Sequence, residues 1–129
     1  MNEIVWIDKH ETLTIHAQQV AEHGGSDDIR DEGLHESALA RAQNPLAYSE
    51  EVPSLPRLAA AYGFGIARNH PFVDGNKRTA AVVSETFLIL NHLSLDATDA
   101  ELVVAFLALA AGELGEDELA GWFRERVRG

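Results

Sequence analysis

The sequence predicts a single all-α domain over residues 1–129, with about six helices and a short irregular or hairpin flap. Its 129 residues are enough for one hydrophobic core and too few for two. Hydrophobic residues make up 46% of the chain, as in folded globular proteins rather than disordered ones. Helix-start signals recur along the chain, and apolar residues at helical spacing follow them. Together these observations favour one compact helical unit.

The first half of the chain predicts two helices joined by a polar loop. Asp8 and Glu11 form a capping-box pattern, and the helix that they open is expected to stop at Gly24. The segment "SDDIRDEG" is the expected loop, and "LHESALARAQ" is a short helix that ends before Pro45. Between Pro45 and Pro53 the chain is expected to be extended or irregular, with a small hairpin as one form.

The second half predicts four helices. Ser54 caps the first of them, which carries Pro56 in its first turn and ends near Asn69. The next runs from Asn76 to about Asn91, and because it is apolar on most sides we expect it at the centre of the fold. A second capping-box pattern, "TDAE", opens the apolar helix "AELVVAFLALAAG". The segment "EDELAGWFRERVR" is the expected last helix.

Charge and composition exclude several classes of function. The formal net charge is −11, which repels nucleic acid and anionic lipid. The longest apolar run, "LVVAFLALAA", is too short to span a bilayer and suits a buried helix. The chain has no cysteine for a disulfide, a thiol nucleophile or a cysteine zinc site. Its first residues lack the pattern of a signal peptide. We therefore expect a cytoplasmic protein that binds neither nucleic acid nor a membrane directly.

The stretch "HPFVDGNKRTA", residues 70–80, breaks a local rule of helix electrostatics. Lys77 and Arg78 lie at the start of a predicted helix, where the helix dipole is already positive and a cation costs a few tenths to about 1 kcal/mol. Gly75 allows the preceding turn a positive φ and lets a ligand come close. The first backbone N–H groups of the helix have no internal partner, so with the two cations they form an anion site. The predicted phosphate-binding residues are Gly75, Asn76, Lys77 and Arg78.

Three further residues of this stretch complete a set for group transfer. Asp74 places a carboxylate beside the phosphate, where Mg²⁺ takes one or two carboxylates, although alone it could also cap the helix. His70 lies across the loop, and an imidazole can take a proton from a hydroxyl near neutral pH. Phe72 alternates with these polar residues and is expected to anchor the loop in the core. The set predicts transfer of a phosphate-containing group to a hydroxyl.

The residues "HPFVDGNKR" also resemble the signature of the Fic/Doc family, and Lys77 matches its Doc branch. Fic enzymes that transfer AMP are expected to carry H-x-F-x-[D/E]-G-N-G-R-x-x-R. This chain has Lys77 at the second glycine and Ala81 at the final arginine, and both departures argue against AMP transfer. The early helix that ends in Gly-Gly, the segment "ALARAQNPLAYSE" and the apolar helices after the motif are similar to Doc proteins as well. The resemblance covers nearly the whole chain.

The resemblance implies a toxin of a toxin–antitoxin pair. Such a toxin would phosphorylate a threonine of elongation factor Tu, with ATP as phosphate donor and Mg²⁺ as cofactor, and so stop translation. The nucleotide would lie reversed relative to Fic enzymes, and Lys77 would fill space and add charge in the phosphate cradle. His70 would be the base, Asp74 the magnesium ligand, and Asn76 and Arg78 further phosphate binders. A flap that docks the target's backbone would include Leu46, Ala47, Tyr48 and Ser49.

The resemblance also implies a partner, and two other functions stay open. The chain has no match to [S/T]-x-x-x-E-[G/N], the inhibitory helix pattern of Fic enzymes, so regulation would come from a Phd-like antitoxin whose disordered C-terminal segment folds onto the toxin. Transfer of AMP or another nucleotide is the first alternative, because His70, Gly75, Asn76 and Arg78 are shared with the Fic pattern. A non-catalytic module that only binds an antitoxin is the second, and it would suit the acidic surface.

Other residues carry weaker signals. The segment "GFGIAR", residues 63–68, has glycines like a phosphate loop but lies inside a helical pattern, so helix packing is expected. Arg68 suits a plain surface position as well as it suits contact with phosphate or antitoxin. His10, His16 and His23 lack the HExxH spacing of a zinc site and are expected on an exposed face of the first helix.

Overall fold

The computed structural model describes residues 3–44 and 54–129. These residues form six α-helices and one small sheet. The helices are α1 (Lys9–His23), α2 (Glu32–Gln43), α3 (Leu55–Asn69), α4 (Asn76–Leu90), α5 (Asp99–Ala110) and α6 (Glu116–Arg126), and the strands are β1 (Ser94–Leu95) and β2 (Val127–Arg128). The predicted all-α fold is confirmed. The predicted flap residues Leu46, Ala47, Tyr48 and Ser49 lie outside the described residues.

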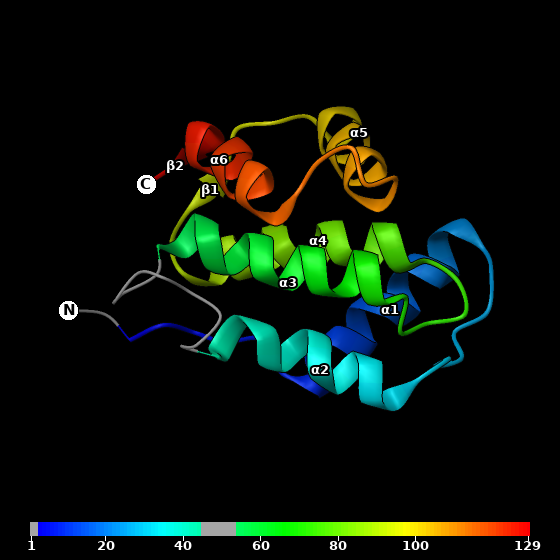
Figure 1. Ribbon diagram of the computed structural model, residues 1–129. Helices are drawn as coiled ribbons and strands as arrows, with labels where there is room; N and C mark the ends of the chain where they lie inside the picture. Colours follow the sequence, from blue (N-terminus) through cyan, green and yellow to red (C-terminus); the bar gives the residue numbers. More distant parts are fainter. Residues whose placement is uncertain (1–2, 45–53) are drawn as a thin grey trace.

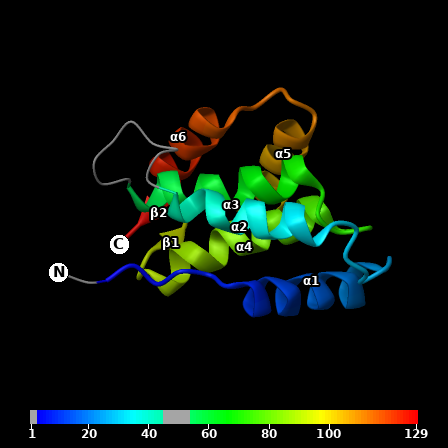
Figure 2. The same cartoon turned by 60° about the horizontal axis from the view of Figure 1, so that its bottom comes forward.

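Helices α3 and α4 lie side by side at the centre of the fold (Figure 1). On one side α2 packs on α3 and α1 packs on α4, and on the other side α6 packs on α3 and α5 on both central helices. The connections α1–α2 and α3–α4 lie together at one end of the molecule, as both Figure 1 and Figure 2 show. This end brings two loops from distant parts of the sequence into contact.

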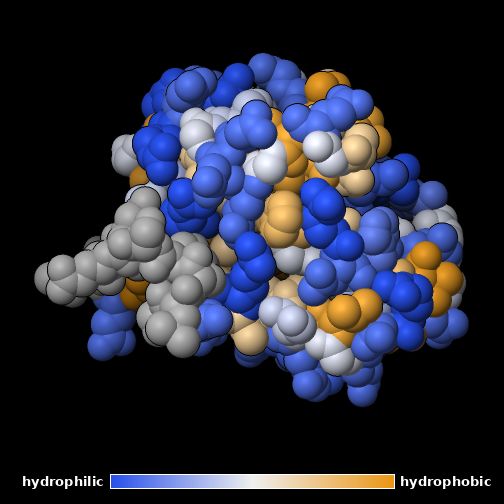
Figure 3. All heavy atoms as spheres, in the orientation of Figure 1, coloured by the Kyte–Doolittle hydropathy of each residue, from blue (hydrophilic) through white to orange (hydrophobic). Residues whose placement is uncertain are grey.

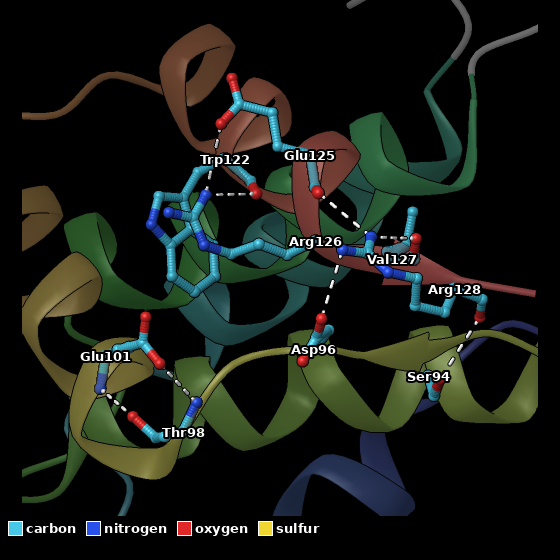
Figure 4. A network of polar contacts seen from close by, with 9 residues as sticks. All are labelled: Ser94, Asp96, Thr98, Glu101, Trp122, Glu125, Arg126, Val127 and Arg128. Atoms are coloured by element: carbon cyan, nitrogen blue, oxygen red, sulfur yellow. Dashed lines mark hydrogen bonds and ion pairs between the residues drawn. The ribbon is translucent and has the colours of Figure 1, made fainter.

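The predicted helix caps at the starts of α1 and α5 are confirmed. In α1 the Asp8 carboxylate accepts from the N–H of Glu11 at 2.8 Å, and the Glu11 carboxylate accepts from the N–H of Asp8 at 3.2 Å. In α5 Thr98 and Glu101 make the same reciprocal pair at 3.1 and 2.9 Å (Figure 4). Hydrogen bonds from Thr98 lower the pKa of the Glu101 carboxyl. Each cap satisfies backbone groups that a helix start leaves unpaired.

The C-terminal end of the chain differs from the sequence prediction. The last helix was expected to run through residues 127 and 128, but α6 ends at Arg126 and β2 pairs antiparallel with β1. The N–H of Asp96 donates to the carbonyl of Arg126 at 2.7 Å, and the Arg128 guanidinium reaches the Asp96 carboxylate at 3.2 Å (Figure 4). Pairing with the segment that follows α4 therefore replaces the last turn of the expected helix.

Close packing of the central helices depends on glycines in α3. A Cβ on Gly63 would lie 2.5 Å from the Ser84 hydroxyl and 2.8 Å from the Phe106 ring. A Cβ on Gly65 would lie 3.1 Å from the backbone of Ala38 in α2. The prediction that "GFGIAR" serves helix packing is confirmed, because both glycines let neighbouring helices approach α3.

The face of the molecule in Figure 3 is mostly hydrophilic, with hydrophobic side chains exposed over α5. Val103, Val104 and Leu107 of this helix have exposed fractions of 48%, 65% and 49%. Within residues 3–44 and 54–129, no helix is both long enough and apolar enough to cross a membrane.

The side chain of a buried histidine in α2 has no hydrogen-bond partner among the described residues. His35 is fully buried, and neither ring nitrogen bonds to any described group. Burial lowers its pKa from the usual 6.5, with Lys9 and His16 acting in the same direction and the carboxylates of Glu32 and Glu36 against it. Burial therefore favours the neutral form of His35 in the folded protein.

We expect Gly63→Ala to destabilise the fold by about 1–3 kcal/mol, because the added methyl has no room beside Ser84 and Phe106. Gly121→Ala is the matched control, since Gly121 also lies in a helix but a Cβ there meets nothing within 4 Å. The control should gain about 0.5–1 kcal/mol from helix propensity. Urea unfolding of both variants measures the difference, and equal stabilities would contradict the packing argument.

We expect the stability of the wild type to fall as pH drops below 6.5, because the unfolded chain takes a proton on His35 that the folded chain refuses. The loss should approach about 1.4 kcal/mol per pH unit and level off below the folded pKa. In His35→Leu this loss disappears. Urea unfolding between pH 7.5 and 5 measures it, with the exposed His23→Gln as control. A His35→Leu profile parallel to that of the wild type would contradict the assignment.

Candidate functional site

The connection between α3 and α4 is a tight turn with two left-handed residues. His70 caps the C-terminus of α3 at φ 50°, and Gly75 precedes α4 at φ 79°. A positive φ costs glycine little but is uncommon for histidine. The Arg30 guanidinium stabilises this backbone from the α1–α2 connection. It donates to the carbonyls of His70 at 2.6 Å and Asn69 at 2.8 Å.

Further backbone hydrogen bonds join the same two connections. The N–H groups of Arg30 and Asp31 donate to the carbonyl of Pro71 at 2.8 and 3.1 Å. The N–H of Val73 donates to the carbonyl of Asp28 at 3.1 Å. Residues 28–31 therefore support residues 70–73 along their length.

Phe72 holds the middle of the turn in the core. Its side chain is 1% exposed and stacks on the His16 ring at a centroid distance of 3.8 Å, with His35 at 5.2 Å. The Asn76 side chain accepts from the N–H of Phe72 at 3.0 Å and donates to its carbonyl at 2.9 Å. The Asn76 amide is thus directed inward. An anion at the turn would meet the backbone N–H of Asn76 rather than its side chain.

The N-terminus of α4 has no side-chain cap, because its cap residue is Gly75. Helices α1, α2, α3 and α5 all have one, whereas α6 also begins at a glycine, Gly115, and has none. The alternative that Asp74 caps α4 is wrong. Its carboxylate Oδ2 instead accepts from the N–H of Ser26 at 2.9 Å. The first N–H groups of α4 are therefore left for a ligand.

A cleft of about 340 Å³ opens at this end of α4. One wall carries the polar motif residues, and the other carries apolar residues of α5. Lys77 and Arg78 are both exposed, and no carboxylate of the described residues forms an ion pair with either. The two cations are therefore free to meet an anionic ligand. The cleft is lined by His70, Val73, Asp74, Gly75, Asn76, Lys77, Arg78, Ala81, Val103, Phe106 and Leu107.

The donor set of the cleft fits a magnesium ion that arrives with phosphate. Within the described ranges no three His, Cys, Asp or Glu side chains gather as metal ligands. Asp74 supplies the only carboxylate among the described residues that line the cleft. Mg²⁺ on a nucleotide takes one or two carboxylates and completes its shell with phosphate oxygens and water. Asp74 could hold such an ion through Oδ1, to which no described group bonds.

The structure brings six predicted site residues to one cleft and places a seventh, Phe72, beneath it. Arg68 does not line the cleft, and its guanidinium lies 5.4 Å from the centre of the Phe64 ring. His16 was expected on an exposed face, and this is wrong: it is 1% exposed and contacts the carbonyl of Asp74 at 2.7 Å. No local pattern signals this contact, because it joins residues 58 positions apart in the chain.

Comparison with known proteins shows the family of the chain. A sequence model of the Fic/DOC family matches residues 6–88. The chain is 41% identical over 92 residues to "Toxin Doc" of Mycolicibacterium smegmatis, a match that spans 71% of this chain and 68% of that protein. It is 31% identical over 119 residues to "Protein kinase doc" of Escherichia phage P1, a match that spans 92% of each chain. The chain therefore belongs to the Fic/DOC family.

Proposed function

We propose that this protein is a Doc-like toxin that transfers the γ-phosphate of ATP to a protein hydroxyl, with a threonine of elongation factor Tu as the expected target. The observation that carries the proposal is the uncapped N-terminus of α4. Lys77 and Arg78 flank it without ion-pair partners among the described residues, and His70 and Asp74 line the same cleft. The names of the two relatives, a toxin and a protein kinase, support the same activity.

In this proposal each group of the cleft has a separate role in phosphoryl transfer. The backbone N–H groups of α4, Lys77 and Arg78 bind the phosphates and oppose the charge that develops on them. His70 takes the proton of the attacking hydroxyl as its oxygen bonds to the γ-phosphorus. The bond from that phosphorus to the bridging oxygen breaks, and ADP leaves with the electron pair. A magnesium ion on Asp74 would neutralise charge on the phosphates.

Two positions of the motif favour phosphoryl transfer over nucleotidyl transfer. Lys77 lines the cleft where the Fic pattern has a glycine, so the cradle gains a cation and loses room. Ala81 lines it where that pattern has an arginine, so a cation of the Fic pattern is replaced by a methyl group. Both differences support an anion site centred on the start of α4.

The proposal includes a protein partner that controls the toxin. A Phd-like antitoxin, with a disordered C-terminal segment that folds on binding, would serve this role in the cytoplasm. The exposed apolar side chains of α5, Val103, Val104 and Leu107, lie next to the cleft and support a partner that covers them.

We expect the purified protein to transfer label to elongation factor Tu from ATP labelled on the γ-phosphorus and not from ATP labelled on the α-phosphorus. In His70→Ala the rate should fall about 10²–10⁴-fold, because the hydroxyl has lost its base. Expression of the wild type should arrest growth, and the variant should not. Label from the α-phosphorus alone would instead support AMP transfer. Growth arrest that survives His70→Ala would support a non-catalytic binding module.

We expect Lys77→Gln to raise the KM for ATP about 10–100-fold, because a charge-assisted contact to phosphate contributes about 1.5–3 kcal/mol. Lys9→Gln is the matched control. It removes the same charge from α1, where Lys9 forms only exposed ion pairs with Glu32 and Glu36 at 3.6 and 3.5 Å. Steady-state kinetics at fixed ionic strength measures both variants. Equal values of KM in the two would remove Lys77 from the phosphate site.

A further inference from the structure

The geometry points to a positioning clamp for Asp74, formed by Gly25 and Ser26 of the α1–α2 connection and by His16 of α1. We infer that this clamp aims the Asp74 carboxylate into the cleft and sets the affinity of the site for a phosphate-bound divalent cation. The inference rests on the proposed function in one respect, the role of Asp74 as the ligand of that cation. His16, Gly25 and Ser26 do not line the cleft and act through Asp74.

The first part of the clamp fixes the side chain. The N–H of Ser26 donates to Oδ2 of Asp74 at 2.9 Å. Gly25 lies so close that a Cβ there would be 3.0 Å from the Cβ of Asp74 and 3.3 Å from Oδ2. The hydrogen bond from Ser26 therefore fixes one oxygen of the carboxylate, and the close approach of Gly25 limits the movement of the side chain on that side. Oδ1 stays without a bond to any described residue and is the oxygen that can face a ligand in the cleft.

The second part fixes the main chain. Nε2 of His16 lies 2.7 Å from the carbonyl oxygen of Asp74, and because a carbonyl only accepts, the imidazole donates. The same ring is 1% exposed and stacks on Phe72 at 3.8 Å. This contact holds the peptide that joins Asp74 to Gly75, whose φ of 79° starts α4. The carboxylate and the first N–H groups of the helix are thus set relative to one another.

A role in positioning follows from how ligating carboxylates behave in proteins. A carboxylate that binds a metal is itself oriented by hydrogen bonds, and loss of such an outer contact typically lowers metal affinity or activity about 10–100-fold. Asp74 has one such contact on its side chain and one on its carbonyl, and both come from residues at least 48 positions earlier in the chain. The backbone of Phe72 is held separately, by two hydrogen bonds to the Asn76 side chain.

Gly25→Ala and its neighbour Gly24→Ala form a matched pair that tests the clamp. Both glycines have a positive φ, 108° and 85°, so both substitutions strain the backbone, but a Cβ on Gly24 meets nothing within 4 Å. We expect Gly25→Ala to raise the Mg²⁺ concentration for half-maximal phosphate transfer about 10–100-fold, with kcat at saturating Mg²⁺ nearly kept. Gly24→Ala should stay within about twofold of the wild type. Equal shifts in the two variants, or none, would overturn the clamp.

A second pair of variants, at His16, distinguishes the effect of hydrogen bonding from the effect of packing. It also tests the clamp if a glycine variant fails to fold. His16→Gln keeps an N–H donor at similar reach, and His16→Leu keeps apolar contact with Phe72 but no donor. We expect the Leu variant to need about 10–100-fold more Mg²⁺ and the Gln variant to restore the wild-type requirement. Identical behaviour of the two variants would overturn the role of His16.

Hydrogen exchange of the free protein distinguishes failure of the clamp from failure of the proposed function. The amides of residues 72–78 should exchange faster in Gly25→Ala and His16→Leu than in Gly24→Ala and His16→Gln, whatever reaction the protein performs. A wild type that transfers no phosphate would refute the proposed function and leave this readout intact. Unchanged exchange in all four variants would refute the clamp itself.

Discussion

Burial of Phe72 beneath the α3–α4 connection is the contact on which the cleft depends. Its ring packs against His16 of α1 and His35 of α2. The Asn76 side chain forms two hydrogen bonds with the backbone N–H and carbonyl of Phe72. The ring therefore fixes where α4 begins, and with it the direction in which the free N–H groups of that helix point. The side chains of His70, Lys77 and Arg78 take no part in these contacts of Phe72 and Asn76. Their neighbours on the buried side hold the turn, so His70, Lys77 and Arg78 are left exposed and without ion-pair partners among the described residues.

The cations at the cleft differ from several others in the molecule in that they form no ion pairs with carboxylates among the described residues. The chain carries a net charge of −11, and several of its arginines are engaged by carboxylates, as Arg41 is by Glu116 at 2.9 Å and Arg57 by Asp117. Lys77 and Arg78 are not so engaged among the described residues. At physiological salt, charges more than about 8 Å apart are largely screened. An anion close to α4 therefore responds mainly to these two cations and the helix N-terminus rather than to the acidic surface.

Local signals predicted most of the fold and most of the site. The capping patterns at Asp8 and Thr98 predicted the starts of two helices, because such a cap depends only on residues three positions apart. The six predicted residues of the cleft were found because they fall within nine positions of one another, whereas the apolar wall from α5 was not predicted. His16 and the pairing of β1 with β2 escaped prediction for the opposite reason. Their partners lie 58 and about 34 residues away, and no local pattern encodes which distant segments meet.

The contact of α1 with the turn has a consequence for how the cleft is assembled as the chain folds. The bonds from His16, Ser26 and Arg30 to residues 69–74 close loops of 39 to 58 residues. Closing loops of this size costs chain entropy before the contacts at their ends form, so we expect these contacts to form late and together. A chain that has folded only α1 and α2, or only α3 and α4, has neither the turn nor the cleft in its final geometry. The cleft thus reaches its final geometry only with the complete core.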